Sequence, residues 1–146
     1  MRQSLSALVL AAGKGTRMNS RKPKVLHEIA GLPLVCHVIE AIKPLQPDNI
    51  VVVIPLGYEN IGEAVKPASI KIQENALGTG NAVKCGLTDL KTLTGTVLVA
   101  FGADPMITTS TLKRLISARE VVNPPDVVVL GFRTENPDRY GRLVLD

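Results

Sequence analysis

Strand-like apolar runs alternate with amphipathic segments along most of the chain. The runs cover residues 5–12, 49–54, 69–73, 96–101 and 126–132, and another begins at residues 142–145. They are short, rich in Val, Leu, Ile and Ala, and followed by Gly, Pro or polar residues. This pattern is typical of strands that are buried on both faces of a parallel sheet. The sequence therefore predicts six strands.

Predicted helices separate these strands. They extend from Pro33 to the breaking Pro44 and Pro47, over 59–65 and 81–87, and from a cap at Thr108 or Thr109 to Pro124. Strands that alternate with helices favour an α/β fold, with an open, mostly parallel sheet and helices on both faces. Ligands of such sheets bind beyond the carboxyl ends of the strands. We therefore expect the functional residues in the loops that follow the strands.

The first predicted strand runs into a loop rich in glycine and cations, residues 13–24. Its chemistry comes from Gly13, Lys14, Gly15, Thr16, Arg17 and, after Pro23, Lys24. Glycine lets the backbone take positive φ and approach a ligand closely, so that successive N–H groups can converge on phosphate oxygens. An arginine adds a planar fork for two oxygens, and a lysine adds a mobile point charge. This loop predicts a phosphate-binding site.

Neither of the two commonest glycine motifs describes this loop. Met18 stands at the sixth position, where the dinucleotide motif has its third glycine, and the P-loop pattern GxxxxGK[ST] is absent. The alternative is a plain glycine turn surrounded by solvated charges. A buried strand, two glycines and the pair Arg17 and Lys24 make a denser combination than such turns usually contain, which favours phosphate binding.

Composition narrows the function classes. With 146 residues, 45% of them hydrophobic and 21% charged, the chain has the make-up of one soluble globular domain. The net charge of +4 is scattered and there is no tryptophan, so a nucleic-acid partner is not expected. Cys36 and Cys85 form no CxxC, which favours reduced thiols in a cytoplasmic protein over a zinc site. No apolar run is long enough to span a membrane, and residues 1–12 predict a strand rather than a signal peptide.

Four stretches of the sequence together resemble one enzyme family. The run from Leu10 to Met18, followed by Pro23-Lys24-Val25-Leu26, resembles the signature loop of sugar-1-phosphate nucleotidyltransferases, especially the bacterial uridyltransferases that act on N-acetylglucosamine 1-phosphate. The further stretches, in the same order as in that family, are Gln73 with 77–80, 101–105 and 140–142. The resemblance implies a Rossmann-like nucleotidyltransferase fold. It also implies that residues 1–146 are the N-terminal part of a catalytic domain that continues further, without the β-helix acetyltransferase domain of the bifunctional members.

The resemblance also implies roles for particular residues. It assigns catalysis at the phosphates to Arg17 and Lys24, the sugar to Gly141, and the nucleotide to Leu10, Ala11, Ala12, Gly13, Gly15, Thr16, Gln73, Gly78 and Thr79. Gln73, Gly78 and Thr79 would read the uracil edge, and an amide with both a donor and an acceptor suits that task. Alternatives remain for several residues of these stretches. Gln73 could be a surface residue, Gly78 a simple helix start, and Tyr140 a packing residue.

The implied reaction transfers UMP from UTP to N-acetylglucosamine 1-phosphate, with Mg²⁺ as cofactor. It gives pyrophosphate and UDP-N-acetylglucosamine, a precursor of peptidoglycan and lipopolysaccharide. Two alternatives stay open: a nucleotidyltransferase of the same fold with another base or sugar, and a nucleotide-binding module without catalysis.

One position departs from the family pattern. The family has Gly-Asp-x-Pro after the fourth strand, with the aspartate holding the metal, whereas this chain has Gly102-Ala103-Asp104-Pro105. Ala103 thus occupies the ligand position, and Asp104 is the candidate metal ligand. A shift by one residue in a regular strand turns a side chain to the opposite face, although a turn could bring Asp104 back. We expect weak metal-dependent binding and little turnover from this chain.

Overall fold

The computed structural model describes residues 3–13, 15, 18–90, 95–138 and 140–144. A four-stranded sheet in the order β5-β4-β1-β6 forms its centre, and all neighbouring strands are parallel. The strands are β1 (Leu5–Leu10), β4 (Asn49–Pro55), β5 (Ser69–Gln73) and β6 (Thr96–Phe101). Each coincides with a predicted strand to within two residues, and the α/β fold expected from the sequence is confirmed.

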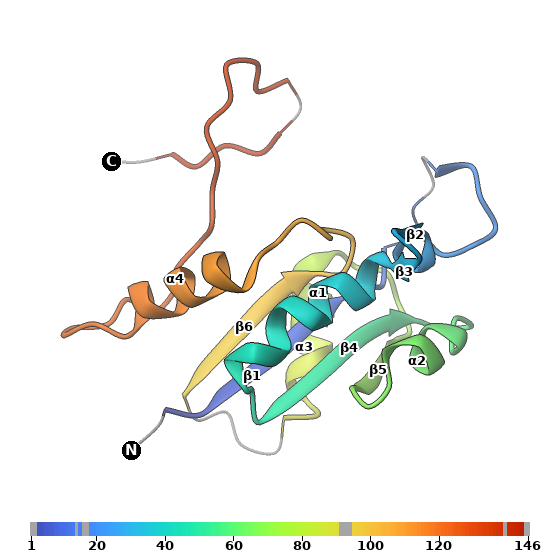
Figure 1. Ribbon diagram of the computed structural model, residues 1–146, viewed down its shortest axis with the longest axis horizontal. Coiled ribbons are helices and arrows are strands. Elements are labelled where there is room, and N and C mark those ends of the chain that lie inside the picture. Colours follow the sequence, from blue (N-terminus) through green and yellow to red (C-terminus); the bar gives the residue numbers. More distant parts are fainter. Residues whose placement is uncertain (1–2, 14, 16–17, 91–94, 139, 145–146) are drawn as a thin grey trace.

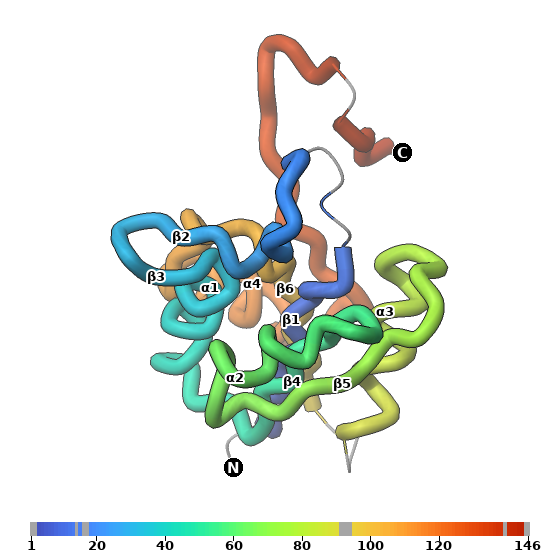
Figure 2. The backbone as a smooth tube through the Cα atoms, turned by 90° about the vertical axis from the view of Figure 1, so that its right-hand side faces the viewer, coloured from blue at the N-terminus to red at the C-terminus, as the bar shows by residue number. Residues whose placement is uncertain are grey.

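Helices cover both faces of the sheet (Figures 1 and 2). One face carries α1 (Leu34–Ile42), α2 (Asn60–Val65) and α4 (Thr109–Arg119), and the other carries α3 (Thr79–Leu87). Thr108 caps α4, because its hydroxyl accepts a hydrogen bond of 3.2 Å from the Thr111 amide. The sequence patterns did not predict the 3₁₀ turns η2 (Lys24–Leu26) and η3 (Lys43–Leu45), or the antiparallel pair of β2 (Glu28–Ile29) and β3 (Leu32–Pro33).

The core explains why β1 is apolar at nearly every position. All six residues of β1 are buried, with Val9 packed in the same cluster as Val35 and Val38 of α1. Leu8 points to the other face and packs with Val51. Because β1 lies between β4 and β6 and beneath helices on both faces, the loop that follows it starts from a rigid point.

The two last predicted strands are wrong. Within the described part of the chain, neither residues 126–132 nor residues 142–144 form a strand, and the chain after α4 runs away from the sheet (Figure 1). Val127, Val129 and Phe132 are exposed by 74%, 62% and 69%. β-propensity describes how well a side chain fits a pleated, half-buried surface, and this segment has no neighbouring strand to supply that surface.

Candidate functional site

A cavity of about 480 Å³ opens at the carboxyl edge of the sheet, between the loops that follow β1, β5 and β6. Most of the residues singled out in the sequence line it: Leu10, Ala11, Ala12, Gly13, Gly15, Lys24, Gln73, Gly78, Thr79 and Asp104. Segments far apart in the chain meet here because parallel strands end at the same edge. The geometry therefore brings these residues together, while their individual roles stay predictions.

The loop after β1 brings a cation to this cavity. Gly15 has φ +58°, and a β-carbon built on it would lie 2.8 Å from the Lys24 β-carbon. The amide of Met18 donates to the Gly15 carbonyl at 2.9 Å. Lys24 opens η2, whose next residues Val25 and Leu26 are buried in the core. Lys24 is half-buried, and the four ion pairs found among the described residues do not include it.

The floor of the cavity is a continuation of the sheet. The Ala11 amide donates to the Val53 carbonyl at 2.8 Å, and the Gly102 amide donates to the Leu10 carbonyl at 2.9 Å. A β-carbon on Gly102 would lie 3.2 Å from that same Leu10 oxygen, a contact tighter than most, so glycine lets the two loops approach each other. One of these bonds joins the end of β1 to the loop after β6, and the other joins the loop after β1 to β4.

The start of α3 forms another side of the cavity. Gly78 precedes the helix with φ +93°, which glycine adopts without strain, and α3 has no side-chain cap. The first backbone N–H groups of a helix lack partners within the helix and carry its positive end. Because Gly78, Thr79 and Ala82 line the cavity, this positive end adjoins the space that Lys24 also lines. The combination suits an anionic ligand.

Gln73, the last residue of β5, is only 5% exposed. Its amide nitrogen donates to Asn81 Oδ1 at 2.7 Å and faces the Gly78 carbonyl oxygen at 3.4 Å. The alternative that Gln73 is a surface residue is therefore wrong. The sequence motifs did not point to Asn81, because nothing in its spacing shows that it lies against Gln73.

Asp104 reaches the cavity through a turn. The Asp104 amide donates to the Phe101 carbonyl at 3.2 Å, so the chain turns immediately after β6 instead of continuing as a strand. Consequently the alternation of faces in a strand no longer applies, and both Ala103 and Asp104 line the cavity. Asp104 is exposed, and of the described residues that line this cavity it alone carries a carboxylate.

A second cavity of about 600 Å³ adjoins the first and shares residues 11–13, Gln73 and Ala76 with it. Arg21 and Lys22 line its outer side, and both are exposed. Lys22 forms an ion pair of 3.1 Å with Glu28.

Some of the predicted residues are not brought to the cavity. Gly141 lies in the C-terminal segment, where the ring of Tyr140 packs edge-on against Phe132 with centroids 5.0 Å apart. Its assignment to the sugar stays a prediction. Thr16 and Arg17, together with Lys14, lie outside the described residues.

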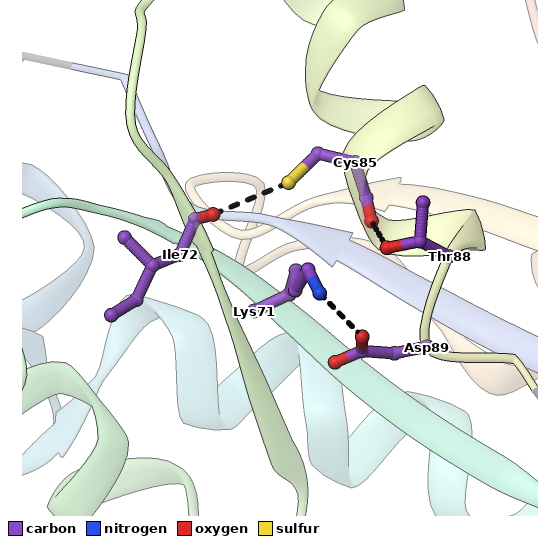
Figure 3. A network of polar contacts seen from close by, with 5 residues as sticks. All are labelled: Lys71, Ile72, Cys85, Thr88 and Asp89. Atoms are coloured by element: carbon purple, nitrogen blue, oxygen red, sulfur yellow. Dashed lines mark hydrogen bonds and ion pairs between the residues drawn. The ribbon is translucent and has the colours of Figure 1, made fainter.

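A network of polar contacts ties α3 and the residues that follow it to β5 (Figure 3). Lys71 donates to Asp89 at 2.6 Å, and the Cys85 thiol donates to the Ile72 carbonyl at 3.2 Å. The hydrogen bond to Asp89 raises the pKa of Lys71 above its ordinary value. Because Ile72 precedes Gln73 directly, the network holds α3 against the end of β5.

The two cysteines are free and play structural parts. Cys36 donates to the Ala64 carbonyl at 3.3 Å, and burial, followed by the charge of Glu40, raises the pKa of its thiol.

Among the described residues there is no group of three or more His, Cys, Asp or Glu side chains that could hold a metal ion by themselves. In that same part of the chain, no helix is both long and apolar enough to cross a membrane.

A known family matches most of the chain. The pattern of the MobA-like NTP transferase domain matches residues 7–139. The chain belongs to this family of nucleotidyltransferases. It is 46% identical over 139 residues to the bifunctional protein GlmU of Rhodospirillum rubrum, which covers 95% of this chain and 31% of the relative. The bifunctional protein GlmU of Paramagnetospirillum magneticum is 45% identical over 141 residues, covering 97% of this chain and 31% of the relative. The chain thus spans about a third of the length of these two relatives.

Solved structures show the same nucleotidyltransferase fold. A nucleotidyl transferase from Methanothermobacter matches with a TM-score of 0.62 at 22% identity, over 78% of this chain and 57% of the other. The protein Rv0371c of Mycobacterium tuberculosis, in a complex with manganese, matches with a TM-score of 0.64 at 16% identity, over 79% and 59% of the two chains. At this level of identity the likeness concerns the fold.

Proposed function

We propose that this chain carries the uridyltransferase site of a sugar-1-phosphate nucleotidyltransferase, which transfers UMP from UTP to N-acetylglucosamine 1-phosphate. The observation that carries the proposal is the meeting of three loops in one cavity, which Lys24, lying against Gly15, lines together with the start of α3. Membership of a nucleotidyltransferase family and the 45–46% identity to GlmU proteins support it. The choice of uridine and of this sugar rests on the motifs.

In the proposed reaction a phosphate oxygen of the sugar 1-phosphate attacks the α-phosphorus of UTP. The new P–O bond gives UDP-N-acetylglucosamine, and the bond between the α-phosphorus and the bridging oxygen breaks, so that pyrophosphate leaves with the bonding electrons. This chemistry needs positioning and neutralisation of charge more than it needs a general base. Backbone N–H groups of residues 12–15 would hold the triphosphate, and Lys24 and Arg17 would neutralise charge on the phosphates.

Other residues would select the base and the sugar. Gln73, Gly78 and Thr79 would contact the base, and Gly141 would contact the sugar. The start of α3 would add the favourable field of a helix amino terminus near the phosphates. Because a backbone hydrogen bond joins Leu10 at the end of β1 to Gly102 after β6, the cavity is suited to holding the two substrates in a fixed relation.

Mg²⁺ fits the cavity only as an ion shared with the nucleotide. Asp104 contributes one carboxylate, and Mg²⁺ commonly binds through one or two carboxylates together with substrate phosphates. When bound, the ion would neutralise the phosphate oxygens and polarise the reacting phosphorus. A fold neighbour solved with manganese is consistent with a divalent cation in this family of folds.

We further propose that the protein acts in the cytoplasm, where UTP is available, in the synthesis of cell wall precursors. A second candidate is a nucleotide-binding module without catalysis, which the alanine at position 103 favours. Pyrophosphate release from UTP and N-acetylglucosamine 1-phosphate, measured beside equilibrium binding of UTP, separates the two. Release of pyrophosphate supports the transferase, binding alone supports the module, and the absence of UTP binding contradicts both.

A further inference from the structure

Gln73 is a buried polar side chain at the boundary of both cavities. It ends β5, is only 5% exposed, and lines the 480 Å³ cavity as well as the adjoining one of 600 Å³. A buried amide must have its polar atoms satisfied, since leaving one without a partner is costly. The hydrogen bonds that this amide makes within the protein therefore determine which of its polar atoms a ligand can bind.

The protein uses the donor end of Gln73 for itself. The Gln73 nitrogen Nε2 donates to Asn81 Oδ1 at 2.7 Å and faces the Gly78 carbonyl oxygen at 3.4 Å. A backbone carbonyl can only accept, so the end of the amide that faces Gly78 must be the nitrogen. With two hydrogens and two internal acceptors, the amide nitrogen is fully engaged. The carbonyl oxygen Oε1 is the atom that Gln73 can offer to a ligand.

We infer that Asn81 is a positioning residue that fixes the Gln73 amide as an acceptor, and that the cavity thereby selects a base whose ring nitrogen carries a hydrogen. Uracil has such a ring N–H at N3, whereas the N3 of cytosine presents a lone pair. A freely rotating glutamine could turn its amide by 180° and serve either base. The fixed amide accepts from uracil and repels the cytosine lone pair. This inference rests on the proposed function and names the specificity-determining contact of that site.

Asn81 is well placed for this task. It is the third residue of α3 and half-buried, and the next residue, Ala82, is anchored in the core beside Val53. The Ala82 amide donates to the Gly78 carbonyl at 3.1 Å, so the two acceptors of Gln73 belong to one rigid turn of the helix. The amide of Gln73 is thus held by a structural element rather than by a mobile loop.

Equilibrium binding of UTP and of CTP to the full chain, in the same Mg²⁺ buffer, tests the inference. The wild type should prefer UTP. Asn81→Leu keeps the side-chain size but removes the acceptor, and should reduce the UTP/CTP preference by about tenfold, the effect typical of one hydrogen bond. Asn81→Asp keeps an acceptor oxygen and should retain the preference, even though its charge weakens the binding of both nucleotides. Thermal melting of the three proteins reports the structural cost separately.

An unchanged UTP/CTP ratio in Asn81→Leu overturns the inference, as does a ratio lost equally in Asn81→Asp. A second readout does not depend on nucleotide. In NMR spectra the side-chain NH₂ of Gln73 should exchange slowly with solvent in the wild type and in Asn81→Asp, and rapidly in Asn81→Leu. If the wild type binds no nucleotide, the proposed function fails and the claim about base selection fails with it. The exchange rate of the Gln73 side-chain NH₂ then tests only whether Asn81 positions this amide. Rapid exchange in the wild type would contradict that role.

Discussion

Gly15 lies directly against Lys24: a β-carbon on Gly15 would lie 2.8 Å from the β-carbon of Lys24. Favourable contacts between carbon atoms lie near 3.5–4.0 Å, so the space beside Lys24 exists because residue 15 has no side chain. Gly15 also has φ +58°, which other residues adopt only with strain. The glycine thus shapes the loop and sets the position of the cation at once.

We expect Gly15→Ala to lose both stability and UTP binding. The left-handed backbone costs about 1–2 kcal/mol for alanine, and the contact with Lys24 adds to that. Gly31→Ala is the matched control, because Gly31 has φ +77° with no atom within 4 Å of an added β-carbon. Gly31→Ala should lose only the stability that corresponds to the strained backbone, and it should keep UTP binding. Urea unfolding and calorimetry compare the two, and equal effects on binding would exclude the coupling between Gly15 and Lys24.

Lys24→Ala should weaken UTP binding by ~1.5–3 kcal/mol, the usual loss for a charge-assisted contact. Arg17→Ala should lose a similar amount if it holds the phosphates. Lys43→Ala is the control, since it also removes one positive charge. Lys43 lies in η3, forms an ion pair with Glu40 and does not line the cavity. Calorimetry at two salt concentrations measures the effect, which should shrink at high salt. Unchanged affinity in both Lys24→Ala and Arg17→Ala would rule out their assignment to the phosphates.

The sequence predicts the sheet and the walls of the cavity because both depend on local patterns. The uniform apolar composition of β1 predicts a buried strand, and Gly13, Gly15 and Gly78 mark loops that line the cavity. The same reasoning fails for residues 126–132. A run of valines has the propensity for a strand in isolation, but strand formation depends on a partner that local sequence does not reveal.

Contacts between distant elements also escape the sequence. Gln73 could be predicted to offer a donor and an acceptor, but only the fold shows that Asn81 and Gly78 take its donor. Likewise Asp104 is misplaced by strand alternation, because the turn after Phe101 decides where its side chain goes. Such effects arise where β-strands end, since the regular periodicity on which prediction rests stops at those residues.

The ion pair of Lys71 with Asp89 should make stability depend on alkaline pH. The hydrogen bond to Asp89 raises the pKa of Lys71, so the folded protein holds this proton more tightly than the unfolded chain does. An ordinary lysine has a pKa of about 10.4. The stabilisation is therefore fully present below that pH, and it is lost as the pH rises through the raised pKa of Lys71. Melting curves of the wild type and Asp89→Asn should differ at pH 8–9 and converge once the pH exceeds the raised pKa of Lys71. A constant difference up to the highest pH would contradict this.

Asp104 and Ala103 make the dependence on metal the most informative property of the site. Both line the cavity, but only Asp104 carries a carboxylate, and the resemblance puts the metal ligand at position 103. The turn after Phe101 lets Asp104 reach the cavity, and Pro105 restricts its backbone to extended conformations. With one exposed carboxylate, an ion would be held mainly by the nucleotide. We therefore expect a weak dependence of UTP binding on Mg²⁺ and little turnover in the wild type.

The double variant Ala103→Asp with Asp104→Val restores the family pattern and should tighten UTP binding in the presence of Mg²⁺ but not in EDTA. One charge-assisted contact corresponds to about 1.5–3 kcal/mol, or tenfold to a hundredfold in the dissociation constant. Asp104→Ala alone should abolish what metal dependence the wild type has. Calorimetric titrations of UTP with Mg²⁺ and with EDTA measure all three proteins. Brisk turnover by the wild type that survives in Asp104→Ala would disprove both the role of Asp104 and the predicted defect, because the site would then reach the transition state without a carboxylate in either position.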